Sequence, residues 1–75
     1  MNELIVEFRA GVSEDDARAA VVAVGAQVRR RMRSDGAIML LVKLGSDPAQ
    51  TRDRVANLPK VARVEDNDDG YGPRS

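Results

Sequence analysis

The chain has 75 residues, and its twelve basic residues balance twelve acidic ones. It contains no cysteine and no histidine, which excludes a zinc finger, a disulfide scaffold and a catalytic triad that needs an imidazole or a thiol. Two side chains, Phe8 and Tyr71, are aromatic, too few for a surface that stacks nucleic-acid bases. The length allows one domain, and the balanced charge gives no overall attraction to nucleic acid or membrane.

The first predicted elements are a strand over residues 3–9 and a helix that begins after Ser13. Apolar residues at every second position give the strand one buried face, made by Leu4, Val6 and Phe8. The Ser13 hydroxyl suits the cap of a helix, and the acidic residues after it complement the positive helix end. A narrow apolar stripe continues to Val24, and Gly25 is expected to end the helix in a left-handed conformation.

A strand rich in arginine is predicted over residues 26–33, followed by a hairpin turn at residues 34–36. Alternation places Val28 and Met32 on the same face as Arg30, and the other face then carries Arg29, Arg31 and Arg33. We interpret this arginine cluster as the charged edge of a sheet rather than as a nucleic-acid site, which would bind with a steep dependence on salt.

The most apolar segment of the chain, residues 37–44, predicts the next strand. Its even-numbered residues are expected to face the core, and they are Ile38, Leu40, Val42 and Leu44. Its odd-numbered residues Met39 and Leu41 then face outward, which leaves an apolar surface on the outer side of the strand.

A second helix is predicted to begin at Pro48, which suits a first turn, and to continue to Leu58, where Pro59 stops it. Residues 61–65 predict a short last strand. Residues 66–75 are polar and contain glycine and proline, so they have no content for a core.

This order of elements predicts an α+β fold of the ferredoxin-like βαββαβ type, with a four-stranded antiparallel sheet and two helices on one face. We assign residues 1–67 to this domain and residues 68–75 to a flexible C-terminal tail. The other face of the sheet is left open. The chain offers no set of catalytic or metal-binding residues, so we expect neither an enzyme nor a cofactor.

The open face is expected to carry an apolar centre of Ile5, Met39 and Leu41, with a charged rim of Arg29, Arg31 and Arg63. An apolar centre with a polar rim is typical of a protein interface. Single exposed apolar residues are also common on protein surfaces, which is the alternative interpretation. An RNA-binding sheet of this type needs aromatic side chains on its central strands, and Ile5, Met39 and Leu41 stand there instead.

Three segments in this order resemble the subtilisin propeptide and proteinase-inhibitor family. They are L-I-V-E-F-R-A-G-V-S near the start, G-A-Q-V before the second strand, and L-P-K-V-A-R-V-E-D-N at the last strand. The resemblance extends over residues 4 to 67 and implies that the open face docks on two surface helices of a subtilisin-like serine protease. It also implies that the C-terminal tail lies in the active-site cleft like a bound product.

The resemblance assigns a role to the end of the last strand, where acidic residues of the family cap the two protease helices. Glu65 matches the first of these positions. The second is Asn67, which can still cap a helix but lacks the charge of the family's aspartate. Asp66 or Asp68 is expected to substitute for it with a small shift.

Two alignments of the tail in the protease cleft are possible, and they place different residues in the primary specificity pocket. Family spacing points to Pro73, whose ring restricts the chain and makes it a poor candidate. Arg74 in that pocket, which we favour, places Tyr71 three residues upstream in an apolar pocket. Tyr71 in the primary pocket is the alternative. The acidic run that ends at Asp69 has ligands that suit calcium but lacks a calcium-loop spacing, so we interpret it as a solvated tail.

The sequence therefore predicts a protein inhibitor of a subtilisin-family serine protease, which also acts as a folding template and is a monomer when free. The alternative is a small regulatory module that binds a ligand, or a second copy of itself, through the same face. The sequence names neither the protease nor the cellular compartment.

Overall fold

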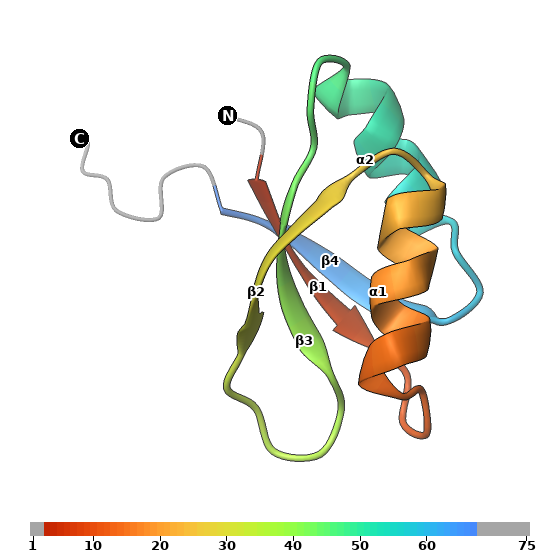
Figure 1. Cartoon of the computed structure of the whole chain (residues 1–75), viewed down its shortest axis with the longest axis vertical. Helices are drawn as coiled ribbons and strands as arrows, with labels where there is room; N and C mark the ends of the chain where they lie inside the picture. Colours follow the sequence, from red (N-terminus) through yellow and green to blue (C-terminus); the bar gives the residue numbers. More distant parts are fainter. Residues whose placement is uncertain (1–2, 68–75) are drawn as a thin grey trace.

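The structure, a computed structural model, describes residues 3–67. These residues form four strands and two helices in the predicted order (Figure 1). The strands are β1 (Glu3–Phe8), β2 (Gln27–Met32), β3 (Met39–Lys43) and β4 (Val61–Asp66), and the helices are α1 (Glu14–Ala23) and α2 (Pro48–Ala56). The prediction of an α+β, ferredoxin-like βαββαβ fold is confirmed.

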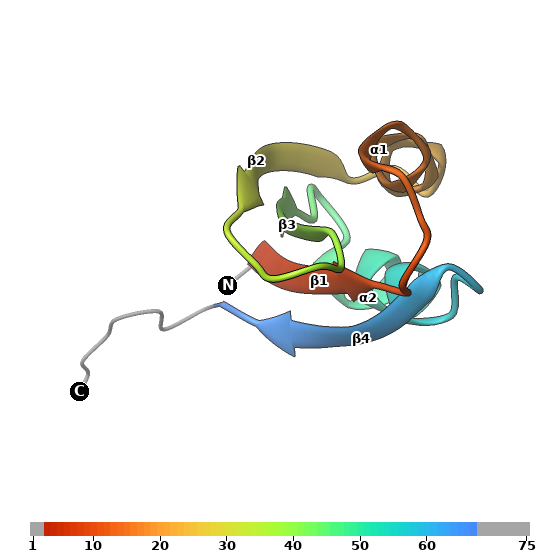
Figure 2. The ribbon, with the colours of Figure 1, turned by 90° about the horizontal axis from the view of Figure 1, so that it is seen from below.

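The four strands form one antiparallel sheet in the order β2-β3-β1-β4, so that β2 and β4 are its two edges. Both helices lie on the same side of the sheet in two perpendicular views (Figures 1 and 2). Helix α1 packs beside β2 and helix α2 beside β4. The sheet side away from the helices is covered by no element among residues 3–67, and we call it the open face.

The hydrophobic core lies between the sheet and the helices. Every second residue of β1 is fully buried there, as the sequence predicted, and these residues are Leu4, Val6 and Phe8. The even-numbered residues of β3 and its flanks are also buried, which confirms that prediction for Ile38, Leu40, Val42 and Leu44. The helices contribute their inward residues to the same core: Ala17, Val21, Thr51 and Val55.

The helix ends follow the chemistry of their capping residues. The backbone N–H of Asp16 donates to the Ser13 hydroxyl oxygen at 3.1 Å, so Ser13 caps α1 as predicted. Gly25 has a φ of +89°, the left-handed conformation expected after the end of this helix. At α2, Asp47 is the N-cap, and Pro48 occupies the first turn, where its missing N–H costs no hydrogen bond.

The arginine-rich strand β2 differs from its prediction. Its pairing with β3 shifts between Val28 and Arg30, which is a β-bulge. Val28 therefore pairs with the buried Val42 on the helix side of the sheet, whereas Arg30 and Met32 lie on the open face. The prediction that Val28 and Met32 share a face was wrong, because one extra residue in the strand reverses the alternation beyond it.

The last strand is longer than predicted. Asp66 is part of β4 and pairs with Leu4 of β1, and the backbone N–H of Asn67 donates to the Glu3 carbonyl oxygen at 3.1 Å. Both residues are therefore held to β1 by the sheet, although the polar segment that contains them has no residues for a core. The predicted tail, residues 68–75, lies outside the described residues. Neither helix within residues 3–67 is long and apolar enough to cross a membrane.

Candidate functional site

The open face has an apolar centre made by two cross-strand pairs. Ile5 of β1 lies opposite Leu41 of β3, and Met39 of β3 lies opposite Met32 of β2. All four side chains are half-buried, although no helix covers them. The structure thus brings together the predicted residues Ile5, Met39 and Leu41 on one surface.

Met32 is the member of this apolar centre that the sequence did not assign to it. Simple alternation placed Met32 with Val28, and the bulge between Val28 and Arg30 moves it to the open face, opposite Met39. No signal for the bulge is visible in the run of arginines, because arginine is tolerated on either side of an edge strand. The one available signal is the predicted outward position of Met39 on the neighbouring strand, which favours an apolar cross-strand neighbour such as Met32.

Two ion pairs lie beside the apolar centre on the open face. The guanidinium of Arg29 extends from β2 across β3 to Glu3 on β1, with 2.9 Å between Nη1 and Oε2. Arg63 on β4 lies opposite Glu7, and its Nε donates to Oε1 at 2.9 Å. The pKa of Arg63 is raised by this hydrogen bond, by the charge of Glu7 and by the nearby carboxylate of Glu65.

The carboxylate of Glu65 differs from those of Glu3 and Glu7. It is exposed and lies on the open face, on the same row of the sheet as Ile5 and Leu41. Within residues 3–67 its side chain makes no hydrogen bond or ion pair, whereas Glu3 and Glu7 are each bound to an arginine. Glu65 is therefore a negative charge at the rim of the apolar centre that is free to meet a partner.

Asn67 lies next to Glu3 just beyond β4. Its side-chain N–H donates to Oε1 of Glu3 at 3.3 Å, which leaves the amide oxygen without a partner among the described residues. An aspartate at this position has no donor and would place a second carboxylate against Glu3. The neighbouring glutamate thus gives a physical reason for asparagine at a position where the family resemblance implied aspartate.

Asp66 and Arg31, which the sequence placed near the proposed contact, face the helices instead. Asp66 accepts from Nε of Arg52 on α2 at 2.9 Å, so it does not share a face with Glu65. Arg31 pairs with the inward Leu40 across the ladder, and its Nη1 is 3.3 Å from Oε1 of Glu14. Asp66 and Arg31 therefore lie on the helix side of the sheet and not on the open face, where they were expected.

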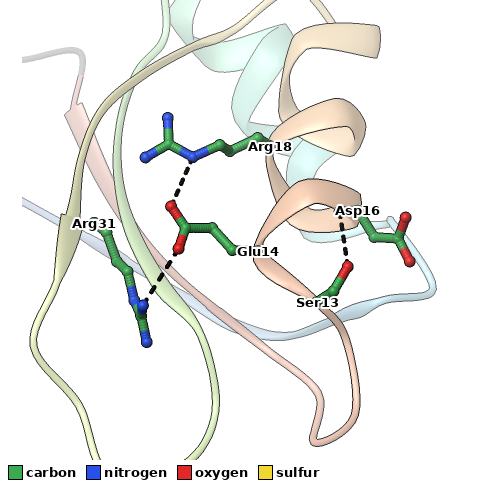
Figure 3. Close-up of polar contacts among 5 residues, drawn as sticks. All are labelled: Ser13, Glu14, Asp16, Arg18 and Arg31. Atoms are coloured by element: carbon green, nitrogen blue, oxygen red, sulfur yellow. Dashed lines mark hydrogen bonds and ion pairs between the residues drawn. The ribbon is translucent and has the colours of Figure 1, made fainter.

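Figure 3 shows the ion pair that Arg31 forms with Glu14. Glu14, in the first turn of α1, accepts from Arg31 with one carboxylate oxygen and from Nε of Arg18 with the other, at 2.9 Å. The same turn holds the Ser13 cap and its bond to Asp16. These contacts tie α1 to the edge strand β2, so we assign them to the fold and not to the site.

Two of the predicted site residues, Tyr71 and Arg74, lie outside the described residues, so their roles remain predictions. No cluster of three or more aspartate or glutamate side chains within residues 3–67 is arranged to hold a metal ion. The arginine cluster of β2 is divided between the two sides of the sheet, and two of its members, Arg29 and Arg31, are in ion pairs.

Comparison with known proteins gave one result. The chain matches the model of a family described as the Fervidolysin N-terminal prodomain over residues 1–67. No curated protein and no solved structure gave a match. The match extends over both helices and all four strands, and it agrees with the resemblance found in the sequence. The chain therefore belongs to the Fervidolysin N-terminal prodomain-like family, which is a family of subtilisin-type propeptides.

Proposed function

We propose that this protein is an inhibitor of a subtilisin-family serine protease, which binds the catalytic domain through its open face and also serves as a template for its folding. The observation that carries the proposal is the family match over residues 1–67, since a prodomain of this kind associates with a subtilisin-like protease. Families of propeptide domains are typically non-catalytic, and we propose the same of this chain.

The composition of the open face supports a contact with another protein. Its four half-buried apolar side chains would be freed from water by a partner that covers them. The ion pairs of Glu3 and Glu7 already satisfy those carboxylates within the domain, so covering them leaves no lone buried charge. An apolar centre beside two internal ion pairs is suited to docking.

Two groups at the end of β4 support a contact with helix ends of the protease. The free carboxylate of Glu65 and the free amide oxygen of Asn67 are both acceptors on the open-face side of the strand. A helix N-terminus has unsatisfied N–H groups and partial positive charge, so each acceptor can bind one such terminus. Glu65 contributes charge and hydrogen bonds, and Asn67 contributes hydrogen bonds alone.

The tail proposal follows from the position of β4. This strand ends at Asp66, beside the two acceptors, so residues 68–75 follow the proposed contact directly in the sequence. We propose that residues 68–75 enter the active-site cleft in an extended form, with Arg74 in the primary specificity pocket and Tyr71 upstream. Extended segments bind such clefts through backbone hydrogen bonds to a strand edge.

An inhibition assay with purified subtilisin tests this function. The full-length chain is expected to inhibit cleavage of a peptide substrate at micromolar concentration and to be cleaved slowly itself. Mass spectrometry of the same samples establishes that intact inhibitor is present while the rate is measured. Full protease activity in the presence of intact, folded chain would contradict the proposal.

A matched pair of variants separates the open face from the rest of the surface. Leu41→Lys places a charge in the apolar centre, and Val22→Lys places the same charge on α1, where Val22 is 63% exposed on the far side of the molecule. Inhibition is expected to be lost in the first variant and kept in the second. Equal potency of the two variants would move the contact away from the open face.

A further inference from the structure

The two edges of the sheet are protected to different degrees. Both edge strands, β2 and β4, present unpaired backbone groups, which are a template for pairing with another strand. In β2, the bulge after Val28 interrupts the edge. If two β2 strands paired around the run from Arg29 to Arg31, arginine side chains would lie opposite one another and repel. Pairing of β2 with a second copy of itself is therefore disfavoured.

β4 also has a register shift in its pairing with β1, between Arg63 and Val61, but from Arg63 to Asn67 the pairing is regular. The N–H of Asn67 donates to the carbonyl oxygen of Glu3, so these two residues form a hydrogen-bonded pair of the antiparallel ladder. Such pairs alternate with non-bonded pairs, and Val64 pairs with Val6 at a non-bonded position. The N–H and C=O of Val64 therefore point away from β1, toward the open edge.

This outward direction defines one symmetric pairing. When two β4 strands pair antiparallel about Val64, the outward groups of Val64 bond to those of Val64 in the second copy. Arg63 of each copy then lies opposite Glu65 of the other. Directly opposite side chains at such positions are within contact distance, and opposite charges there are attractive.

The side chains concerned are available for this pairing. Glu65 has no partner within residues 3–67, and Arg63 uses its Nε for Glu7, which leaves the donors of its terminal amino groups. On the helix side, the half-buried side chain of Val64 would lie beside its own copy and lose contact with water. The Arg63–Glu65 pairs on the open face and the Val64 contact on the helix side therefore favour the same register, the one centred on Val64.

We propose that two copies of this chain associate through β4, in an antiparallel register centred on Val64 and with two reciprocal Arg63–Glu65 pairs. The two four-stranded sheets then become one continuous sheet. The proposal depends on the chain alone and not on a protease. It uses a sheet edge, unlike self-association through the open face, and it replaces the sequence-based expectation of a free monomer. Because Glu65 serves both contacts, the dimer and the proposed protease complex compete for it.

Sedimentation equilibrium of the full chain, from micromolar to millimolar concentration, tests the dimer. The parent chain is expected to dimerise. Glu65→Arg and Arg63→Glu should each weaken the dimer roughly tenfold or more, because two attractive pairs become two repulsive ones. A mixture of the two variants restores both opposite-charge pairs, so it should form a heterodimer. Arg30→Glu, a charge reversal on the other edge strand, is the control and should leave the dimer intact.

A variant of the backbone gives an independent test. Val64→Pro removes the outward N–H, which makes no bond to β1, so circular dichroism should show a folded chain that no longer dimerises. A parent chain that stays monomeric at every concentration would overturn the proposal, as would a dimer that is unchanged by Glu65→Arg. Failure of the mixture to form a heterodimer would also overturn it. Inhibition of subtilisin is a separate measurement, so the dimer can fail while the proposed function stands, and the reverse.

Discussion

The two sides of the sheet are built from the same four strands but have different composition. The helix side is closed by α1 and α2, and its largest side chains, Phe8, Leu4 and Leu40, are fully buried. The open face holds Ile5 and Leu41 among ion-paired charges, and these side chains are only half-buried. Period-two alternation along each strand thus separates residues that hold the fold from residues that remain available to a partner.

This difference shows how a short chain can specify both a fold and a binding surface. A domain of this size obtains only a few kcal/mol of net stability, on the order of 3–5 kcal/mol, from a single core. A substitution on the helix side therefore acts on the whole fold. A substitution on the open face acts mainly on association, because the side chains there are still partly exposed and become buried only when a partner binds.

The largest effect is expected from the helix side. Phe8→Ala removes a fully buried ring and should lower the free energy of unfolding by about 3–5 kcal/mol, which is comparable to the whole stability of the domain. The variant should be largely unfolded by far-UV circular dichroism at 25 °C. Phe8→Leu, which keeps most of the apolar volume, is the control and should remain folded. A cooperative, native-like thermal transition of Phe8→Ala would show that the core does not depend on this ring.

The next effect is expected at the centre of the open face. Leu41→Lys should weaken inhibition of subtilisin by about 100-fold or more, because the partner would bury an unpaired charge at a central position. Urea unfolding should show a loss of stability of only about 1 kcal/mol, since the side chain is half-buried. The control Val22→Lys should change neither quantity. A large loss of stability in Leu41→Lys would mean that the open face belongs to the core.

A smaller effect is expected at the rim of the open face. Glu65→Gln keeps the acceptor oxygen but removes the charge, so the contact with a helix N-terminus should weaken by about 0.3–1 kcal/mol, or about two- to fivefold in the inhibition constant. Stability should be unchanged, because this carboxylate has no partner within residues 3–67. The loss of affinity should shrink at high salt. A loss that does not depend on salt would contradict a role for the charge.

The smallest effect is expected from pH between 6 and 8. The chain has no histidine and no cysteine, so it lacks the side chains that change charge in this range. The pKa of Arg63 is raised by its hydrogen bond to Glu7 and by the charge of Glu7, so the stabilising contribution is complete between pH 6 and 8 and is lost only as pH rises through the raised value. That loss lies far above pH 8. The midpoint of urea unfolding should therefore be the same at pH 6 and pH 8, and a clear shift would reveal a titrating group that this account omits.

Most of the fold follows from sequence patterns. The alternation of Leu4, Val6 and Phe8, the cap at Ser13 and the left-handed Gly25 each predict a local structure that the fold contains. Together they were sufficient for the element order and the placement of the core. They were also sufficient to place Ile5, Met39 and Leu41 on one surface, because that surface is the complement of the buried one.

The remaining features depend on contacts between distant residues. The bulge that brings Met32 to the open face arises from pairing with β3, and the arginines around it carry no alternation that reveals it. The choice of partners is equally non-local: Glu3 meets Arg29, and Glu14 meets Arg31, across 26 and 17 positions of the chain. Charged side chains can satisfy many partners, so their pairing follows from the fold and does not define it.

The most direct test of the central claim is methyl NMR of the labelled chain during titration with active-site-inactivated subtilisin. We expect the methyl signals of Ile5, Met39 and Leu41 on the open face to shift or broaden as the complex forms. The signal of Val22 on α1 should stay unchanged. A complex that perturbs Val22 and leaves the three open-face residues unaffected would contradict the assignment of this face as the docking surface.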